Sequence, residues 1–382
     1  MTIRDVTRAL LGVVLLAGGA AAADRSSADW TPADPDRTWS FPADHYPHPE
    51  TSIEWWYFTG LVEDVADPSV RFGYQFTFFR VGLTPGDDAA APGASRWRAR
   101  DAIMGHAAVT DLSTGEHRFS ELFRRAAPIV AGFGDGGSDL VAWSRAPAGT
   151  DDRWELRWNG TGFEFTARDD AAGVTFSFTT TPARPLVFQG ENGYSPKDAD
   201  GAAASSYYSF TRLDTTGSVT LDGRPRAVRG TSWMDHEFSS SQLNERQVGW
   251  DWFSLRLEDG RDLMLYVLRR ADGSVDHARG TLVEADGRAR ILGVDDWSLR
   301  AEGTWTSPES GARYPSGWRI EVPSAALELV VRPYVEAAEN VSRRLENLHY
   351  WEGAVEVEAG GARVGEGFVE LTGYGDDARL PL

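Results

Sequence analysis

The sequence predicts an all-β protein made of two tandem antiparallel β-barrels. Short runs of alternating apolar and polar residues recur along the chain, separated by turn signals rich in Gly, Asp and Asn. No long amphipathic helical pattern interrupts these runs. The second half of the chain repeats the order of the runs in the first half, which indicates two similar domains.

The bulk composition limits the function classes. The 382 residues are 41% hydrophobic, which is enough to fill the cores of two ordinary domains. The formal net charge of −19 repels nucleic acid and anionic lipid, so we expect neither as a partner. Cysteine is absent, which excludes disulfides, a thiol nucleophile and a Cys-based zinc site. Lys197 is the only lysine, and we attribute this bias to genome composition.

The N-terminus has the composition of a secretory signal over residues 1–23. Arg4 and Arg8 precede an apolar run over residues 9–20, and Ala21-Ala22-Ala23 follows. The run is too short to span a bilayer comfortably, so we expect cleavage after Ala23 and a periplasmic or secreted protein. A retained N-terminal anchor is the alternative. Residues 24–40, rich in Asp, Ser, Ala and Pro, are expected to form a flexible lead-in.

Residues 41–50 contain three prolines, which disfavour both a helix and an interior strand. His45 and His48 lie three positions apart in this segment. Prolines spoil the helical geometry that would aim both imidazoles at one metal ion, and nothing nearby in the sequence completes a ligand set. We therefore interpret the segment as a packed loop and expect no metal.

The first β-hairpin is predicted over residues 54–62 and 71–81. Alternation places Glu54 on the same face as Trp56 and Phe58, so a carboxylate lies along an aromatic row. Four aromatic residues of the second strand also share one face: Phe72, Tyr74, Phe76 and Phe78.

The rest of the first half continues with short strands. They are predicted over residues 102–110, 116–123, 153–158, 162–167, 173–179, 206–212 and 217–221. One short helix is expected near Glu121 to Ala126. Residues 189–204 are predicted to form a long loop, the kind of segment in which lids and binding residues occur.

The internal repeat sets the expected domain organisation. Residues 250–255 and 263–269 correspond to 55–62 and 72–80, and residues 350–357 and 367–374 correspond to 207–220 and 230–238. We therefore expect a first domain over residues 41–240 and a second over 241–382. Many short antiparallel strands per half suit an up-and-down barrel, which closes its own edges and often keeps a ligand cavity.

Two neighbouring stretches combine acids, an imidazole and indoles. They are Trp233-Met234-Asp235-His236-Glu237-Phe238 and Gly249-Trp250-Asp251-Trp252-Phe253. Indoles are rarely left in water, so the stretches are expected to be buried or to line a pocket at the junction of the two domains. A carboxyl group beside such a wall loses hydration, which favours its protonated form. Asp235 is therefore a candidate proton donor near neutral pH.

Taken with Glu54-Trp55-Trp56-Tyr57-Phe58-Thr59-Gly60 and Tyr350-Trp351-Glu352-Gly353, these motifs resemble the lipocalin-like CrtC/AttH family. That family includes carotenoid hydratase (hydroxyneurosporene synthase) and exported proteins described as predicted secreted hydrolases. The resemblance covers nearly the whole chain after the signal, and it implies two tandem lipocalin-like barrels and a hydrophobic ligand. In the hydratase branch an Asp-His pair similar to Asp235-His236 is expected to serve acid catalysis. Met234 and Glu237-Phe238 depart from that branch and bring the chain closer to the secreted branch.

The sequence and the resemblance together yield a set of candidate site residues. Asp235, His236 and Glu54 are the candidate catalytic residues, in a hydration or a hydrolysis that needs no cofactor. Indole faces are expected to stabilise a cationic intermediate. The candidate ligand-binding residues are Trp55, Trp56, Tyr57, Trp233, Glu237, Trp250, Trp252, Tyr266, Trp351 and Glu352.

Other interpretations remain open at this stage. Asp235 is also compatible with a turn cap or an arginine partner, Glu54 with an arginine partner, and the strand tryptophans with core packing. The protein could be a non-catalytic periplasmic carrier of a lipophilic ligand that works beside an ABC-type transporter. Paired acids and abundant Trp also occur in carbohydrate-active proteins, which is the weakest of the three readings. Neither the ligand nor the oligomeric state follows from the sequence.

Overall fold

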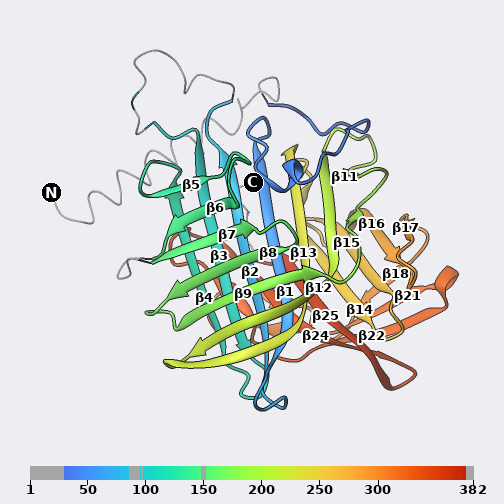
Figure 1. Cartoon of the computed structure of the whole chain (residues 1–382). Helices are drawn as coiled ribbons and strands as arrows, with labels where there is room; N and C mark the ends of the chain where they lie inside the picture. The colour runs from blue at the N-terminus through green and yellow to red at the C-terminus, as the bar shows by residue number, and fades with distance from the viewer. Residues whose placement is uncertain (1–29, 86–94, 96–97, 148–151, 376–382) are drawn as a thin grey trace.

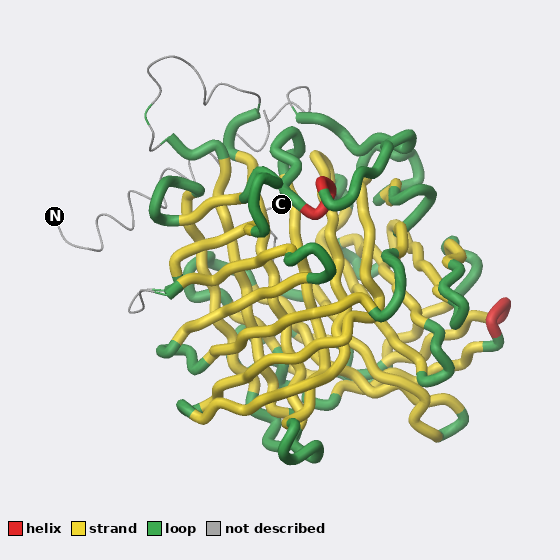
Figure 2. Tube along the Cα trace, in the orientation of Figure 1, coloured by secondary structure: helices red, strands yellow, loops and turns green. Residues whose placement is uncertain are grey.

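A computed structural model of the chain describes residues 30–85, 95, 98–147 and 152–375. The expected signal over residues 1–23 and its cleavage site lie outside these residues. The described chain consists of β-strands and the loops that join them, together with two 3-10 turns at Ala43–His45 and Pro323–Ala325 (Figure 2). The all-β prediction is confirmed. No helix in the described part is long and apolar enough to cross a bilayer.

The first half of the chain forms one antiparallel sheet. Its hydrogen-bonded order is β4-β3-β2-β1-β13-β12-β9-β8-β7-β6-β5, with β10 and β11 added to β12. In Figure 1 the strands β5 to β9 cross in front of β1 to β4, so the sheet curls into a nearly closed barrel. Its strands are β1 (Ile53–Asp64), β2 (Arg71–Gly82), β3 (Asp101–Asp111), β4 (His117–Arg125), β5 (Ala131–Phe133), β6 (Leu140–Arg145), β7 (Arg153–Trp158), β8 (Phe163–Asp169), β9 (Val174–Pro182), β10 (Val187–Phe188), β11 (Tyr194–Pro196), β12 (Ala204–Leu221) and β13 (Arg224–Ser241).

The second half forms a second antiparallel sheet with the order β17-β16-β15-β14-β25-β24-β22-β21-β18, and β23 is added to β24. Its central strand β14 pairs with β15 and β25 as β1 pairs with β2 and β13. The strands are β14 (Gln247–Leu257), β15 (Asp262–Arg270), β16 (Val275–Val283), β17 (Ala289–Leu292), β18 (Ser298–Ala301), β21 (Trp318–Val322), β22 (Leu327–Pro333), β23 (Glu339–Val341), β24 (His349–Ala359) and β25 (Ala362–Thr372). A separate two-stranded ribbon joins β19 (Trp305–Thr306) and β20 (Arg313–Tyr314).

The predicted helix is wrong. The short helix expected near Glu121 to Ala126 is part of β4, whose Arg125 pairs with Ala102 of β3. A ladder of hydrogen bonds to a neighbouring strand outweighs the weak helical tendency of so short a segment.

Strand alternation divides the apolar side chains among three cores. The aromatic row of β2 points into the first core, together with Trp56 and Phe58 of β1. A second core lies within the second sheet and includes Phe253 and Trp351. The third core lies between the two sheets. It contains Tyr57, Leu61, Tyr207, Trp233, Trp252, Met264, Tyr266, Leu268, Ala354 and Phe368.

Charged groups also join the two sheets. Asp262 at the start of β15 has no exposed side-chain surface and pairs with Arg184 and Arg212 of the first half, each at 2.8 Å. Arg71 of β2 reaches Glu366 of β25 at 2.5 Å. The outer face of the first barrel is therefore packed against the second sheet.

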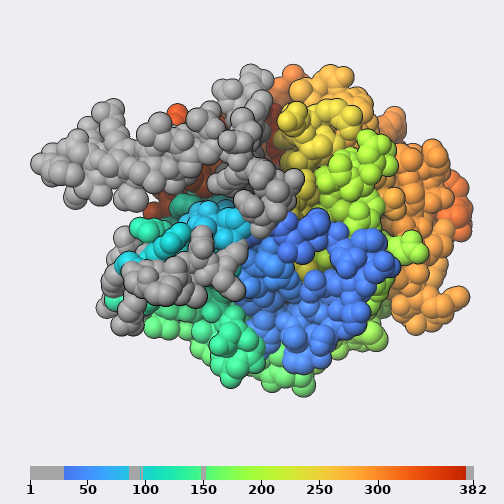
Figure 3. Space-filling model, turned by 90° about the horizontal axis from the view of Figure 1, so that it is seen from above, coloured from blue at the N-terminus to red at the C-terminus, as the bar shows by residue number. Residues whose placement is uncertain are grey.

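The N-terminal segment closes one end of the first barrel. Seen from above in Figure 3, it lies in blue over the first half of the chain. The Trp39 indole donates to the Asn192 carbonyl oxygen at 2.9 Å, and the Asn192 amide donates to the Arg37 carbonyl oxygen at 2.9 Å. The 3-10 turn that follows brings Asp44 and His45 into the barrel end, where both are buried.

Candidate functional site

A pocket lies between the two sheets, on the outer face of the first barrel. Its walls come from β1, β2, β3, β12 and β13 on one side and from β14, β15, β24 and β25 on the other. The lining residues are Trp55, Tyr57, Thr77, Phe79, Met104, His106, Lys197, Tyr207, Asp235, Glu237, Gln242, Leu243, Trp250, Trp252, Tyr266, Leu268, Tyr350 and Glu370. Aromatic side chains dominate the lining, as in sites that bind apolar small molecules.

Asp235 carries a carboxyl group on the wall formed by the first sheet, and the residue is only 3% exposed. Its Oδ2 accepts a hydrogen bond from the Tyr207 hydroxyl at 2.6 Å. Its Oδ1 accepts from the Trp233 indole at 2.7 Å and from the Ser209 hydroxyl at 2.5 Å. All three donors come from β12 or from β13 itself, so strand pairing fixes the position of the carboxyl group.

The pKa of Asp235 is raised to about 7. Burial is the main cause, because a carboxylate loses its hydration there. The hydrogen bonds from Ser209, Tyr207 and Trp233 act in the opposite direction, and the nearby charge of Glu237 adds to the increase. Asp235 can therefore hold a proton near neutral pH, and the same three donors stabilise the carboxylate that remains once the proton leaves.

Glu237 lies two positions further along β13 and pairs with the only lysine of the chain. Lys197 Nζ is 2.6 Å from Glu237 Oε1, and both residues are about 5% exposed. The ammonium group also lies 4.7 Å from the centre of the Tyr266 ring and 5.3 Å from that of Tyr207. Burial lowers the pKa of Lys197, but the charge of Glu237 outweighs it and the pKa is raised, so the pocket contains a fixed cation.

The second sheet contributes a carboxyl group in the equivalent position. Glu370 of β25 pairs in register with Trp252 of β14, as Asp235 of β13 pairs with Tyr57 of β1. Burial raises the pKa of Glu370 to about 7. A hydrogen bond from the Trp250 indole, at 2.9 Å, lowers this pKa but does not cancel the effect of burial. The charge of Asp235 adds to this increase, so the two carboxyl groups lie within electrostatic reach of each other.

Glu352 is a third acid between the sheets and is 1% exposed. Its Oε1 accepts a short hydrogen bond from the Tyr57 hydroxyl. Burial and the charge of Glu370 raise the pKa of Glu352 well above its ordinary value, which favours the protonated side chain. Glu352 therefore links the two sheets beside the pocket.

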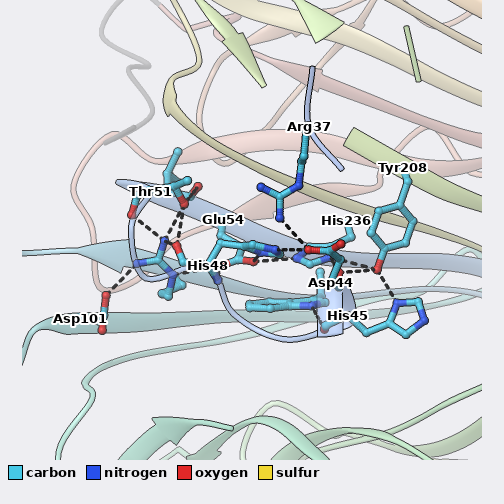
Figure 4. Close-up of polar contacts among 12 residues, drawn as sticks. Arg37, Asp44, His45, His48, Thr51, Glu54, Asp101, Tyr208 and His236 are labelled. Atoms are coloured by element: carbon cyan, nitrogen blue, oxygen red, sulfur yellow. Dashed lines mark hydrogen bonds and ion pairs between the residues drawn. The ribbon is translucent and has the colours of Figure 1, made fainter. Parts of the chain in front are cut away.

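Glu54 and His236 lie on the other face of the same strands, at the end of the first barrel (Figure 4). Glu54 Oε1 is 2.8 Å from His236 Nε2 and 2.7 Å from His48 Nδ1. Its Oε2 accepts from Arg80 Nε at 2.9 Å. His48 Nε2 is 3.1 Å from an Asp44 carboxylate oxygen. We refer to Asp44, His48, Glu54, Arg80 and His236 as the barrel-end network.

Charges balance within the barrel-end network. Burial would raise the pKa of Glu54, but the charge of His48 and the hydrogen bonds from His236 and His48 hold it well below its ordinary value. Burial would lower the pKa of His48, but Glu54 and Asp44 outweigh burial and raise it. Burial lowers the pKa of His236, which is therefore the neutral imidazole of the network. Two ionised acids, Asp44 and Glu54, thus face two cations, protonated His48 and Arg80, so the formal charges of the network balance.

His48, Glu54 and His236 bring three metal-ligating atoms within 4.8 Å of one another. Sequence reasoning missed this grouping, because the three residues come from segments far apart in the chain. Both imidazoles already face the same Glu54 oxygen, while Arg80 occupies the other oxygen. A guanidinium group in that position opposes a bound cation, so the geometry fits a hydrogen-bonded network better than a metal centre.

The structure thus separates the candidate residues into groups. The pocket brings together Asp235, Trp55, Tyr57, Glu237, Trp250, Trp252 and Tyr266. Trp233 and Glu352 lie directly behind its wall through their contacts with Asp235 and Tyr57. Glu54 and His236 belong to the barrel-end network. Trp56 and Trp351 are fully buried in the first and second cores.

Several pocket residues were not among the sequence candidates, chiefly Lys197, Tyr207, Glu370, His106 and Tyr350. Two of them had a signal in the sequence. Lys197 is the only lysine in a chain whose other basic side chains are all arginine. Glu370 falls within residues 367–374, which correspond to 230–238, so the repeat itself relates it to Asp235.

Comparisons with known proteins agree with this fold. The family model described as AttH-like matches residues 32–374. The chain belongs to the AttH-like family. Among curated protein sequences, no match was found.

Solved structures show the same architecture. The crystal structure of an AttH-type protein from Nitrosomonas europaea is 32% identical, has a TM-score of 0.78, and is matched over 90% of this chain and 99% of that one. Kievitone hydratase from Nectria haematococca has 14% identity and a TM-score of 0.61, over 90% and 95% of the two chains. CghA has 16% identity and a TM-score of 0.54, over 91% and 96%. The similarity to kievitone hydratase and to CghA shows a shared fold and nothing more.

Proposed function

We propose that this AttH-like protein binds a hydrophobic small molecule, terpenoid- or lipid-like, between its two sheets and hydrates or hydrolyses it by acid–base catalysis. The observation that carries the proposal is the buried carboxyl group of Asp235, which has a pKa of about 7 on the wall of an aromatic pocket. Kievitone hydratase is a hydratase with this fold, so the fold is compatible with such chemistry.

In a hydration, protonated Asp235 transfers its proton to one carbon of the ligand's alkene, and a cation forms on the other carbon. The faces of Tyr57 and Trp252 line the pocket and stabilise positive charge. Water attacks the cation and gives a proton to the carboxylate of Glu370. The alkene has then gained the elements of one water molecule, and a proton returns from Glu370 to Asp235 through solvent.

In a hydrolysis, the same two groups have related tasks. Asp235 protonates the leaving oxygen, and Glu370 takes the proton of the attacking water. Both routes need one protonated and one ionised carboxyl group. Asp235 and Glu370 both have pKa values near 7, and their negative charges repel each other. Near neutral pH, ionisation of one therefore favours protonation of the other, which satisfies this requirement.

Asp235→Asn tests the proposal because it removes the proton donor while keeping the shape of the side chain. The matched control is Asp214→Asn, an exposed position on the neighbouring strand β12. Water adducts of trans-4-hydroxystilbene and geraniol are measured by mass spectrometry, and nitrophenol release from p-nitrophenyl hexanoate is measured by absorbance. We expect turnover of at least one probe, which Asp235→Asn lowers by about 10² to 10⁴ and Asp214→Asn leaves unchanged.

The opposite outcome is also defined. Equal probe binding by the wild type and Asp235→Asn, with no product from either, would contradict catalysis. The protein would then be a carrier of a lipophilic ligand, such as one working beside an ABC-type transporter.

We also propose that the chain is exported and cleaved after Ala23, as the composition of residues 1–23 indicates. The N-terminal mass of the protein recovered from periplasmic and cytoplasmic fractions tests this. A mature protein that begins at Met1 in the cytoplasmic fraction would contradict export.

A further inference from the structure

A row of directly paired residues crosses the first-sheet wall of the pocket. Asp235 of β13 pairs with Tyr57 of β1, Tyr57 with Thr77 of β2, and Thr77 with His106 of β3. Directly paired residues point to the same face of a sheet, and all four line the pocket. Neighbouring strands lie about 4.8 Å apart, so three steps place His106 roughly 14 Å from Asp235 along the wall.

The second sheet provides a matching row in the same direction. Tyr266, Trp252, Glu370 and Glu352 pair in register across β15, β14, β25 and β24. At one end the Trp252 indole donates to the Tyr207 hydroxyl beside Asp235 at 3.2 Å. At the other end the Tyr350 hydroxyl, two positions before Glu352, lies 2.8 Å from His106 Nδ1. The pocket is therefore elongated, with Asp235 and His106 at opposite ends.

The wall between these two ends is mainly apolar. A parallel row formed by Trp55, Phe79 and Met104 lies beside the first one, and all three residues line the pocket. Phe79 meets the His106 ring edge to face, with ring centroids 5.3 Å apart. A ligand that follows this wall from Asp235 meets mainly apolar surface, apart from the polar atoms of Tyr57 and Thr77, before it reaches His106.

His106, the last residue of the row, has a ring nitrogen, Nε2, that is free to bond a ligand. The residue is 1% exposed, and its Nε2 has no hydrogen-bond partner among the residues that the structure describes. Burial lowers the pKa of His106 to about 3, so the imidazole is neutral. Nδ1 is held by Tyr350, which leaves Nε2 as the nitrogen free to bond a ligand in either tautomer. A buried nitrogen without a partner is costly unless a ligand or water pairs with it.

We propose that the ligand is an elongated, mostly apolar molecule with a hydroxyl or carbonyl oxygen at the end remote from Asp235, and that His106 Nε2 hydrogen-bonds this oxygen. The inference rests on the proposed ligand pocket, but not on catalysis. It assigns His106 a binding role that fixes the orientation of the ligand in the pocket. The alkene or ester to be attacked is then presented to Asp235.

Two rigid probes that differ in one oxygen test the proposal. Trans-stilbene is an apolar rod with one central alkene, and trans-4-hydroxystilbene adds a hydroxyl group at one end. Their dissociation constants are measured by energy transfer from the pocket tryptophans. We expect the wild type to bind the hydroxylated probe about tenfold more tightly, which is the effect of one buried hydrogen bond.

His106→Phe keeps an aromatic ring but removes the nitrogen, so the preference should fall to about one while trans-stilbene still binds. His106→Gln supplies an amide and should recover part of the preference. Asp235→Asn should keep the full preference, because it changes the other end of the pocket. If His106→Phe fails to fold, His106→Gln takes its place as the test variant, and a preference as large as that of the wild type would then overturn the proposal.

The proposal is overturned if the wild type binds both probes equally or binds neither. It is also overturned if His106→Phe keeps the tenfold preference, since the hydroxyl group then lies elsewhere, for example beside Asp235. Loss of the preference in His106→Phe without turnover in any variant would refute the proposed catalysis while supporting this binding role. The two failures are therefore distinguishable.

Discussion

The barrel-end network predicts that Glu54→Gln destabilises the protein strongly. Glu54 has no exposed surface, and its carboxylate accepts from Arg80 Nε, from the His48 ring and backbone nitrogens and from the His236 ring, at 2.7 to 2.9 Å. An amide cannot balance the charges of Arg80 and His48. Removing one member of a buried ion pair costs about 3–5 kcal/mol.

The measurement is urea unfolding at pH 7, followed by tryptophan fluorescence. Glu63→Gln is the matched control, because Glu63 lies on the same strand and pairs with Arg229 at 3.1 Å on the exposed surface. Such a surface pair contributes about 1 kcal/mol or less. At low temperature, folded Glu54→Gln should still bind trans-4-hydroxystilbene, because the network faces away from the pocket.

Two results would refute this reasoning. A loss of less than about 1 kcal/mol would mean that the network does not hold the barrel end together. A Glu54→Gln variant of wild-type stability that binds the probe but has lost turnover would restore the catalytic role that the sequence indicates for Glu54.

The remaining predictions concern titration and buried charge. Turnover should be greatest near pH 7, because it falls at higher pH as the donor Asp235 loses its proton and at lower pH as the acceptor Glu370 gains one. Glu370→Gln should lower turnover and remove the fall at low pH, whereas a rate that keeps rising well above pH 7 would exclude Asp235 as the acid. His48 has a folded pKa above its ordinary value of 6.5, so its stabilising contribution is complete below pH 6.5 and is lost as the pH rises through the folded pKa. In His48→Gln the melting temperature should therefore fall less steeply above pH 6.5 than in the wild type. If it falls as steeply as in the wild type, groups other than His48 cause the fall. Lys197→Met should cost about 3–5 kcal/mol in urea unfolding, because the buried carboxylate of Glu237 loses its cation. The double variant Lys197→Met, Glu237→Leu should recover most of that loss, and a double variant no more stable than the single one would argue against the pair.

Local patterns predicted most of the long strands and the burial of Asp235. Period-2 alternation in residues 71–81 correctly placed an aromatic row in the first core, because side chains of a strand must point alternately to two faces. Indoles around Asp235 correctly indicated desolvation, since they surround it in sequence as well as in space. The same argument treated His236 and Glu54 as neighbours of Asp235 in one site, although alternation carries them to the opposite face.

Sequence by itself determined the all-β class, the repeated order of the strands and the family, and it predicted that Asp235 is shielded from water. These properties depend on residues close together in the chain or on a pattern that recurs along it. Only the tertiary structure decided that Lys197, Glu370 and His106 share the pocket while the Glu54 carboxylate neutralises Arg80. The reason is physical: the packing of one sheet on the other brings Glu370 into the same pocket as Asp235 and Lys197, more than a hundred residues away in the chain, and no local pattern encodes which side chains meet.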